Sequence, residues 1–255
     1  MAGSAPRTEK TKNHMKSAIK KVAQTFLSVP RFYHSPSTDR NVCATLIAAF
    51  LLLTLPLAPA RATPPAAPGS IITAAGDWHW LFSAIAAKGN TFSTFTEKRA
   101  FAARKDPVVL TGEMRLIPAT GLSLRYITPE ETLTIIDTRG LYLRDAKGRT
   151  REIKAGTRDA GLVAALLPVM RFDEENLFKN FVIHAARNGG DWRFDFVPRD
   201  AKIAAALGSI TVTGVGTEIQ RLGFNASPKV RVEVIVGETK TGVTFSDDDL
   251  KKYFR

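Results

Sequence analysis

Residues 112–126 read GEMRLIPATGLSLRY, the clearest part of a stretch from Thr91 to Phe196 that decides the fold. Large apolar side chains occupy alternate positions in this stretch: Met114 and Leu116, then Leu122, Leu124 and Tyr126, and later Trp192, Phe194 and Phe196. A period of two places one set of side chains on one face of a β-sheet and the other set on the opposite face. The sequence therefore predicts a sheet with one strongly apolar face, bent into a half-open barrel around an apolar hollow.

Further apolar runs, separated by turn residues such as Gly, Pro and Asp, extend this pattern in both directions. We expect about 9–11 strands in all, since each run has the composition of a strand. The expected strands cover residues 91–101, 108–117, 121–127, 131–137, 140–144, 182–186, 192–197, 209–213, 218–222, 229–236 and 242–245. Connections this short require neighbouring strands to run antiparallel. The expected fold class is α+β, an incomplete antiparallel barrel with short helices over its concave apolar face.

Several segments depart from this alternation and have the 3.6-residue period of a helix. Asp77 is a candidate N-cap for the first helix. The second helix runs until Pro168 stops it, and Asp173 opens a third with acidic residues at its N-terminus. Ser246 and Asp249 resemble a capping box for a final helical turn.

Residues 1–62 have the three parts of a cleavable signal peptide. Eight Lys and Arg residues precede an uncharged apolar run of about 16 residues, and the small-residue site Ala60-Arg61-Ala62 follows. A membrane anchor is the alternative, since about 20 apolar residues span a bilayer, but Pro56 and Pro59 favour cleavage. We expect a basic leader and signal peptide at 1–62, a flexible Pro/Ala-rich lead-in at 63–76 and a single domain at 77–255.

Removal of this leader changes both the charge and the cysteine content of the chain. The formal net charge is +12, but the leader holds nine Lys or Arg and two acidic residues, so the remainder carries +5. Such a balance is weak support for nucleic-acid binding, which needs a concentrated basic face. The single cysteine, Cys43, lies in the apolar run, so the exported domain has no disulfide, zinc thiolate or thiol nucleophile.

Residues that could carry catalysis or bind a metal do not gather in the sequence. His79 and His184 lie far apart without a His, Cys or acid at ligand spacing, so we interpret both as structural. We interpret Asp247-Asp248-Asp249 as the start of a helix and not as a cation site. Candidate acid–base carboxylates are Glu97, Glu130 and Glu131, but nothing in the sequence pairs them across a site. We expect no catalytic residues, no metal and no cofactor.

The order of these segments resembles the periplasmic outer-membrane lipoprotein carrier family, LolA. The segments that carry the resemblance are Phe95-Thr96-Glu97, residues 112–116, 122–129 and 134–143, Leu166-Leu167-Pro168, and residues 177–181 and 192–198. The resemblance covers about residues 77–245. It lies in the order of apolar patterns and not in catalytic groups.

The resemblance implies a periplasmic carrier whose apolar barrel shelters the acyl chains of a lipoprotein, or of a related lipid, in transit to the outer membrane. The implied partners are the acylated cargo, an inner-membrane donor and an outer-membrane acceptor, and the carrier is expected to be a monomer. The implied cavity lining is Phe95, Met114, Leu116, Leu122, Leu124, Tyr126, Leu133, Ile135, Leu141, Leu143, Ile183, Trp192 and Phe194. The implied lid is Trp78, Leu81, Phe82, Leu166, Leu167, Leu177 and Phe178.

One position departs from the family pattern. A typical carrier has an arginine just before the proline loop that follows the Gly-Glu strand, where it bonds to the lid. This chain has residues 116–120, Leu-Ile-Pro-Ala-Thr, at that place, without an arginine. Arg115 and Arg125 lie nearby, but the alternation places them on the opposite face from Met114. The departure favours a divergent member that carries another lipid or a glycolipid.

The same apolar pattern has three other interpretations. The proposed lining and lid residues could form the plain core of an α+β domain. A non-catalytic periplasmic interaction or sensor domain with the same fold would have a filled hollow and an exposed sheet edge. A hydrolase would need two facing carboxylates, or a His–acid pair, in a cleft.

Overall fold

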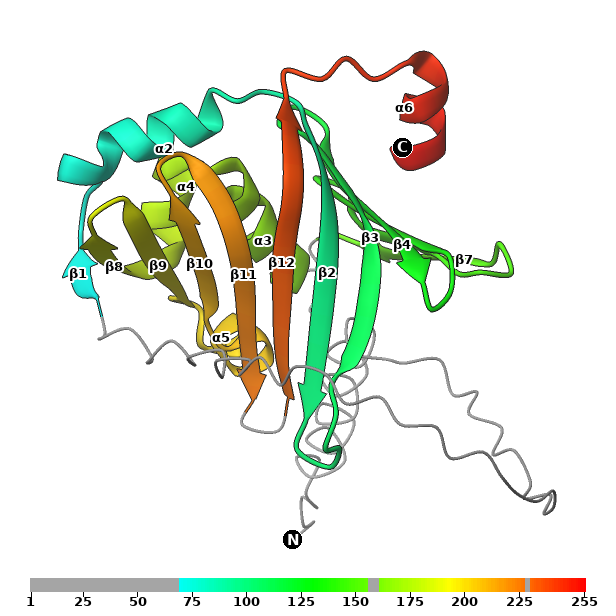
Figure 1. The fold of residues 1–255 in the computed structure, drawn as a ribbon, viewed down its shortest axis with the longest axis horizontal. Coiled ribbons are helices and arrows are strands. Elements are labelled where there is room, and N and C mark those ends of the chain that lie inside the picture. The colour runs from blue at the N-terminus through cyan, green and yellow to red at the C-terminus, as the bar shows by residue number, and fades with distance from the viewer. Residues whose placement is uncertain (1–68, 156–160, 228–229) are drawn as a thin grey trace, which may run out of the picture.

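The computed structural model describes residues 69–155, 161–227 and 230–255. The predicted leader and signal peptide at 1–62 lie outside these residues, as does the first part of the lead-in. Within them, twelve strands form one sheet in the order β1-β8-β9-β10-β11-β12-β2-β3-β4-β5-β6-β7 (Figure 1). Every pair of neighbours is antiparallel, as predicted.

The elements have the following bounds. The strands are β1 (Ser70–Ile72), β2 (Thr91–Phe101), β3 (Val108–Ile117), β4 (Gly121–Thr128), β5 (Thr132–Asp137), β6 (Gly140–Arg144), β7 (Thr150–Lys154), β8 (Phe181–Asn188), β9 (Asp191–Pro198), β10 (Ile210–Val215), β11 (Glu218–Ser227) and β12 (Val230–Thr241). The helices are η1 (Gly76–Trp78), α2 (His79–Ala86), α3 (Gly161–Arg171), α4 (Glu174–Asn180), α5 (Ala201–Leu207) and α6 (Asp247–Tyr253).

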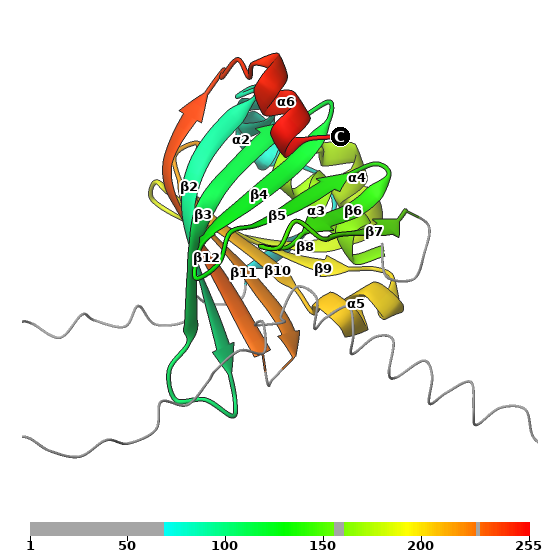
Figure 2. The same cartoon turned by 90° about the vertical axis from the view of Figure 1, so that its right-hand side faces the viewer.

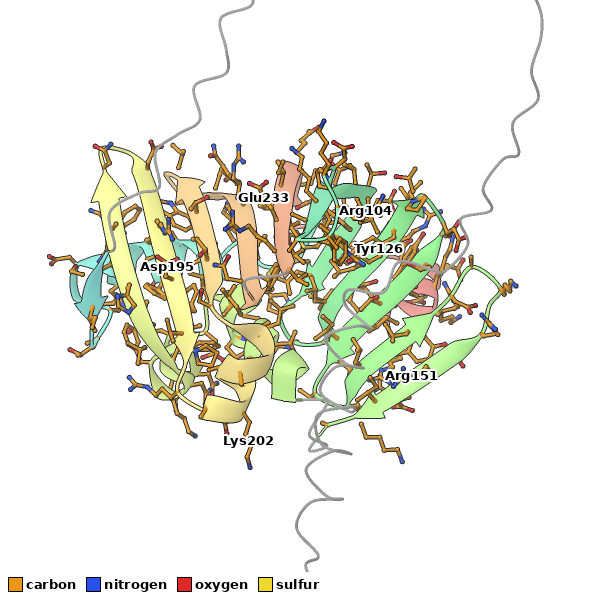
Figure 3. All side chains as sticks on the ribbon, turned by 90° about the horizontal axis from the view of Figure 1, so that it is seen from below. Arg104, Tyr126, Arg151, Asp195, Lys202 and Glu233 are labelled. Carbon is orange, nitrogen blue, oxygen red and sulfur yellow. The ribbon has the colours of Figure 1, made fainter. Side chains whose placement is uncertain are left out.

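The sheet bends into a trough that does not close, because its two edge strands, β1 and β7, do not pair with each other. This arrangement confirms the half-open antiparallel barrel. α3 and α4 lie against the inner face, α2 lies across the upper ends of β8–β11, and α6 lies on the outer side (Figures 1 and 2). Seen from below, the strands arch from β8 over β12 to β7, with α3 and α5 inside the arch (Figure 3).

Helix α3 passes through Pro168 and ends at Arg171, so the predicted stop at the proline is wrong. Proline removes one backbone hydrogen bond of a helix and crowds the preceding turn. The residues that follow are buried nonetheless, with Val169 1% and Met170 7% exposed. Burial of these side chains against the sheet offsets the cost of the proline, so the helix gains one more turn.

The predicted helix starts have different outcomes. Asp77 is not an N-cap, because it lies inside the turn of η1 and no side chain caps α2. Asp173 does cap α4, since its side chain accepts a hydrogen bond from the backbone N–H of Asn176. The capping box of Ser246 and Asp249 is confirmed at the start of α6. None of the helices in the described part of the chain is long and apolar enough to cross a membrane.

The strand predictions fail mainly at the ends of the chain and of the sheet. β1 lies within the predicted flexible lead-in, and residues 242–245 do not form the expected strand. β7 has no counterpart among the predicted strands. Only Ile153 of its five residues is buried, because an edge strand exposes most of its side chains. Without an apolar alternation, such a strand has no period-two signal.

A second, smaller core forms on the outer face of the sheet, beneath α6. It consists of Ile117, Leu133, Ile135, Tyr253 and Phe254. The guanidinium of Arg115 lies 3.8 Å from the centre of the Tyr253 ring, a cation–π contact on this same face. Arg115 therefore points away from the hollow, as the alternation predicted.

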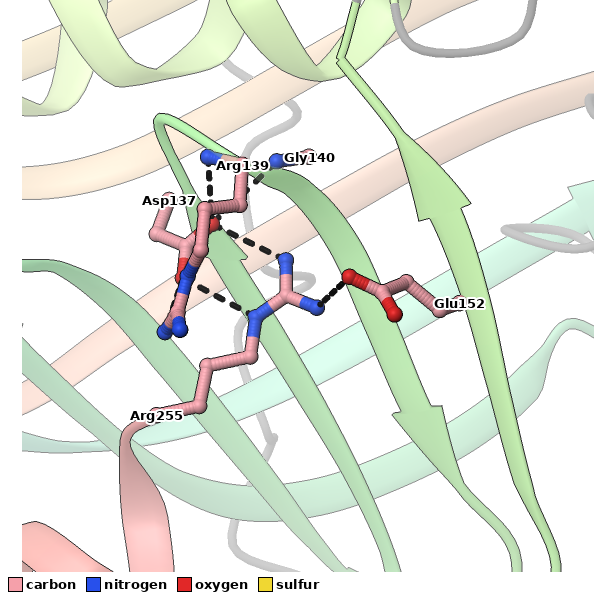
Figure 4. A network of polar contacts seen from close by, with 5 residues as sticks. All are labelled: Asp137, Arg139, Gly140, Glu152 and Arg255. Atoms are coloured by element: carbon pink, nitrogen blue, oxygen red, sulfur yellow. Dashed lines mark hydrogen bonds and ion pairs between the residues drawn. The ribbon is translucent and has the colours of Figure 1, made fainter.

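A polar network fixes the chain after α6 to the sheet (Figure 4). Asp137 is 6% exposed and accepts hydrogen bonds from Nε and Nη2 of Arg255, both at 2.9 Å. The backbone N–H of Arg139 donates to the same carboxylate at 2.8 Å, and Arg255 also binds Glu152. Burial alone would raise the pKa of Asp137, but the bonds from Arg255 and Arg139 outweigh burial and lower it.

The Asp137→Asn variant should lose stability in a pH-dependent way. At pH 7 the expected loss is about 2–3 kcal/mol, typical of hydrogen bonds to a charged group. Because the folded-state pKa lies below the unfolded value of about 3.9, the contribution is complete above about pH 5 and disappears as the pH falls through the folded pKa. Urea unfolding of both proteins at pH 7, 5 and 3 should show the difference shrinking only at pH 3.

The control for this measurement is Asp106→Asn, because Asp106 is an exposed residue of the β2–β3 connection. Its unfolding curves should match those of the unmodified chain at every pH. A difference between Asp137→Asn and the unmodified chain that stays constant from pH 7 to pH 3 would contradict the depressed pKa.

Candidate functional site

The inner face of the sheet is the candidate site, because alternate residues of successive strands meet there. On one side of the trough, Ile183 of β8 lies opposite Phe196 of β9. On the other side, Leu122 of β4 lies between Leu116 of β3 and Ile136 of β5. Together with the helices, these side chains form one continuous cluster of buried apolar residues. The alternation in the sequence therefore produces a single apolar inner surface.

Aromatic rings pack closely on the β8–β10 half of this face. The ring centre of Phe194 lies 4.8 Å from Trp78, 5.1 Å from Phe82 and 5.5 Å from Trp192. Phe172, which follows α3, adds a fourth ring at 6.2 Å. Such separations are those of edge-to-face and tilted pairs in a packed core. This half of the trough is filled by the protein's own side chains.

Eleven of the expected lining residues lie on the inner face, in the main cluster or packed against it. They are Phe95, Met114, Leu116, Leu122, Leu124, Tyr126, Leu141, Leu143, Ile183, Trp192 and Phe194. The other two, Leu133 and Ile135, were placed on the wrong face. They belong to the outer core beneath α6, because β5 pairs Thr134 with Leu124 and thereby turns residues 134 and 136 inward.

The expected lid residues all lie over the inner face. Trp78, Leu81, Phe82, Leu166, Leu167, Leu177 and Phe178 belong to the main cluster or pack against it. Leu81 and Leu177 are fully buried, and the Phe82 and Phe178 rings lie 6.0 Å apart. An exposed contact joins the two parts of the lid, since His79 Nδ1 of α2 lies 2.9 Å from Glu174 Oε2 of α4.

A small cavity separates the lid from strands β2, β3, β11 and β12. Its volume is about 50 Å³, and its walls include Ile85, Met114, Leu116, Met170 and Arg171. For comparison, an apolar cavity of about 150 Å³ is large enough for benzene. An acyl chain therefore enters this interface only if the lid helices move away from the sheet.

A buried polar group interrupts the apolar face below Phe95. Glu97 and Arg99 follow Phe95 at alternate positions of β2, and their side chains are only 6% and 8% exposed. The two form an ion pair, and the Tyr126 hydroxyl donates a hydrogen bond to Glu97 Oε2 at 2.8 Å. Burial raises the pKa of Tyr126, and the Glu97 carboxylate raises it further, so the phenol remains a donor.

This triad was missed by sequence reasoning, which treated Glu97 as a carboxylate without a partner. The signal was present, because Glu97 and Arg99 share the face of Phe95 at a spacing of two. The sequence could not indicate the third member, Tyr126. It lies on β4, which the fold places next to β3 and close to Glu97 of β2. The apolar inner surface therefore ends at this triad, below Phe95 on β2.

The remaining candidates for chemistry do not form a site. Among the described residues, the His184 side chain has a hydrogen-bond contact with the backbone carbonyl of Gly69 at 3.4 Å, and His79 makes its contacts on the surface. Asp249 belongs to the capping box of α6, as predicted for the acidic run. Within the described ranges, no three His, Cys, Asp or Glu residues gather as a metal site would require.

Comparison with known proteins gives one family and several distant folds. A family model described as "Outer membrane lipoprotein carrier protein LolA-like" matches residues 70–232. No curated protein matches the sequence. A solved DUF1329 family protein from Desulfovibrio piger is 8% identical with a TM-score of 0.38, covering 68% of this chain and 95% of its own.

Two further solved structures resemble the chain at a similar distance. A LolA superfamily protein from Nitrosomonas europaea is 5% identical with a TM-score of 0.37, covering 66% of this chain and 96% of its own. The Pseudomonas aeruginosa MucA/MucB complex is 14% identical with a TM-score of 0.35, covering 69% of this chain and 60% of the matched chain. All three TM-scores lie below 0.5, so we draw the assignment from the family model alone.

Proposed function

This chain belongs to the LolA-like family of outer membrane lipoprotein carrier proteins, and we propose that it carries an acylated lipoprotein or a related lipid across the periplasm. The observation that supports this most directly is the apolar inner face beneath a lid of separate short helices. Each acyl CH₂ moved from water onto such a surface gains about 0.8 kcal/mol, so binding needs apolar area and no catalytic group.

Cargo binding requires the lid to exchange its contacts with the sheet for contacts with acyl chains. The lid helices are short, and α3 and α4 meet at Phe172, whose backbone φ is 49°. A left-handed backbone is costly for a residue with a side chain. We propose that α3 moves away from β4–β6 during loading, while Phe172 and the rest of the aromatic cluster around Phe194 stay packed.

Export of the domain is part of the proposal. Residues 1–62 would act as the basic leader and signal peptide, leaving a domain from about residue 77 to residue 255 in the periplasm. The donor would lie in the inner membrane and the acceptor in the outer membrane. The carrier is proposed to work as a monomer without cofactor or catalysis.

Native mass spectrometry of protein purified from the periplasm, followed by lipid extraction, tests this function. An acyl-bearing molecule present at about one per chain is the expected result, and its mass identifies the cargo class. A protein mass without cargo, together with no uptake of an added fluorescent fatty acid, would exclude the carrier function.

The second candidate function is a non-catalytic interaction or sensor domain with the same fold. Two observations favour it: the filled aromatic half of the trough, and a groove of about 620 Å³ on the outer face beside α6. Leu133, Ile135 and Leu250 give this groove an apolar floor, with Lys251 and Lys252 among its basic residues. A mass without cargo and no fatty-acid uptake would favour this role.

The Leu124→Glu variant distinguishes a cargo surface from a plain core. Leu124 is half-buried on the inner face, opposite Met114. If acyl chains lie there, the variant should remain folded and lose at least about ten-fold in affinity for a fluorescent fatty acid, because a carboxylate replaces an apolar contact. Circular dichroism and a fluorescence titration measure the two properties.

Ile127→Glu is the matched control, since Ile127 lies on the same strand but is 45% exposed. It should bind the fatty acid as the unmodified chain does. If Leu124→Glu unfolds while Ile127→Glu does not, Leu124 is ordinary core and the proposed cargo surface does not extend to β4.

A further inference from the structure

Arg171, the last residue of α3, carries a guanidinium that has unused hydrogen-bonding capacity among the described residues. Its Nε and Nη2 atoms are buried, and neither has a hydrogen-bond partner within the described residues. Buried polar groups are nearly always paired, because an unpaired donor loses its bonds to water without replacement. The two nitrogens belong to the edge of the guanidinium that binds an oxyanion through two parallel hydrogen bonds.

The same edge is paired with a carboxylate at three other arginines of this chain. Nε and Nη2 of Arg193 donate to Asp195 at 2.7 and 2.8 Å. Arg255 donates through the same two atoms to Asp137 at 2.9 Å each. Arg139 does so at 3.1 and 3.0 Å. Arg171 therefore presents a two-pronged donor that elsewhere in the chain holds a carboxylate.

Among the residues that the structure describes, the cavity around Arg171 has an apolar wall and no unpaired acid. Arg171 lines the cavity between the lid and the sheet, beside Met114, Leu116 and Met170. The acid of that cavity, Glu218, pairs with Lys88 at 2.5 Å.

The backbone holds Arg171 at this place. α3 ends immediately after it, because Phe172 takes the left-handed φ of 49° and the N–H of Asp173 bonds to the carbonyl of Pro168 at 3.0 Å. Phe172 is 1% exposed, and its ring packs against Phe82 and Trp192. A buried aromatic anchor thus fixes the residue next to the guanidinium.

We propose that Arg171 binds the oxyanion, a carboxylate or a phosphate, at the polar end of an acyl cargo whose chain enters between the lid and the sheet. This inference rests on the proposed carrier function and specifies its cargo. The acyl chain of a cargo with an anionic end contacts the apolar walls of the cavity, and its oxyanion accepts hydrogen bonds from the unpaired guanidinium edge. Neutral acyl chains of the same length gain only the first of these contributions.

The test uses displacement of a neutral fluorescent probe, N-phenyl-1-naphthylamine, from the purified domain. Palmitic acid, palmitoyl lysophosphatidic acid and hexadecanol are the competing ligands, and inorganic phosphate is added alone. Arg171→Gln should weaken binding of at least one of the two anionic lipids by about ten-fold or more, as expected for a lost charge-assisted pair. Hexadecanol affinity should stay within about two-fold. Arg171→Lys should recover part of the loss, since a point charge without the fork remains.

Arg104→Gln is the control, because Arg104 is an exposed arginine in the β2–β3 connection (Figure 3). The substitution removes one positive charge, as Arg171→Gln does. It should bind all ligands as the unmodified chain does. Which anionic lipid depends on Arg171 separates a carboxylate from a phosphate cargo. Equal weakening of palmitic acid and hexadecanol, or no weakening of either anionic lipid, would overturn the proposal.

Three other outcomes concern the source of the anion and the function itself. Displacement by inorganic phosphate alone, with the same dependence on Arg171, would overturn the assignment to a lipid. If the unmodified chain binds neither the acids nor hexadecanol, the carrier function fails and this inference fails with it. Binding of hexadecanol and palmitic acid without a role for Arg171 would leave the carrier function in place and remove only the oxyanion site.

Discussion

Replacement of Phe194 by alanine should destabilise the domain by about 3–5 kcal/mol, the usual cost of removing a buried phenylalanine side chain. Phe194 is 0% exposed and lies within the rings of Trp78, Phe82, Phe172, Trp192 and Phe196. Its removal leaves a hole bounded by aromatic rings on both the sheet and the lid. These neighbours cannot all move inward at once, so little of the hole closes.

Urea unfolding followed by tryptophan fluorescence measures this effect, because Trp78 and Trp192 report directly on the cluster. Phe245→Ala is the control, since Phe245 is only half-buried and contacts the outer core. Phe245→Ala should lower the free energy of unfolding by clearly less than Phe194→Ala does. A loss below about 1 kcal/mol for Phe194→Ala would mean that the ring faces open space, and that the hollow extends over β9.

The sequence locates the strands well where turn residues mark their ends. β2, β3 and β6 have the predicted bounds, because Gly89, Pro118 and the Asp145–Gly148 turn lie at or near their ends. Edge strands are harder to find. β1 is three residues long and β7 is mostly exposed, so neither produces the apolar alternation on which the prediction depends.

The sequence is less informative about which face a strand presents. β5 reads Thr-Leu-Thr-Ile-Ile-Asp, and five of its six residues are buried, because the lid covers one face and α6 the other. Alternation does not separate two faces that are both covered. Leu133 and Ile135 were therefore assigned to the hollow. The decisive information was the pairing of Thr134 with Leu124, which only the fold supplies.

Polar groups of the site were the least predictable part. Arg99 and Glu97 lie two residues apart. Exposed ion pairs on strands have the same spacing, so the spacing does not show that this pair is buried. Their burial depends on Tyr126, which approaches from β4. Arg171 follows a proline that was expected to end its helix, so nothing in the sequence placed it at a cavity. Tertiary contacts, not local pattern, decide these positions.

The Glu97→Ala variant should lose about 3–5 kcal/mol, because it leaves a buried guanidinium without its counter-charge. Arg99 and the Tyr126 hydroxyl both lose their acceptor. Glu233→Ala is the matched control, since the Arg221–Glu233 pair is 56% and 38% exposed. An exposed pair contributes about 0–1 kcal/mol, so this control should change stability little. Thermal and urea unfolding at pH 7 measure both variants.

The double variant Glu97→Leu, Arg99→Met tests whether the ion pair serves stability or selectivity. Replacement of a buried pair by apolar residues of similar volume is often neutral or stabilising by about 1–4 kcal/mol. The double variant should therefore be more stable than Glu97→Ala, although the Tyr126 hydroxyl lacks its acceptor in both. The same change extends the apolar inner face beyond Phe95. Affinity for longer acyl chains should then rise relative to shorter ones, because added chain length contacts apolar surface in place of a charged pair. Unchanged chain-length preference in a stable double variant would mean that cargo does not reach the lower part of β2, and that the triad lies outside the cargo surface.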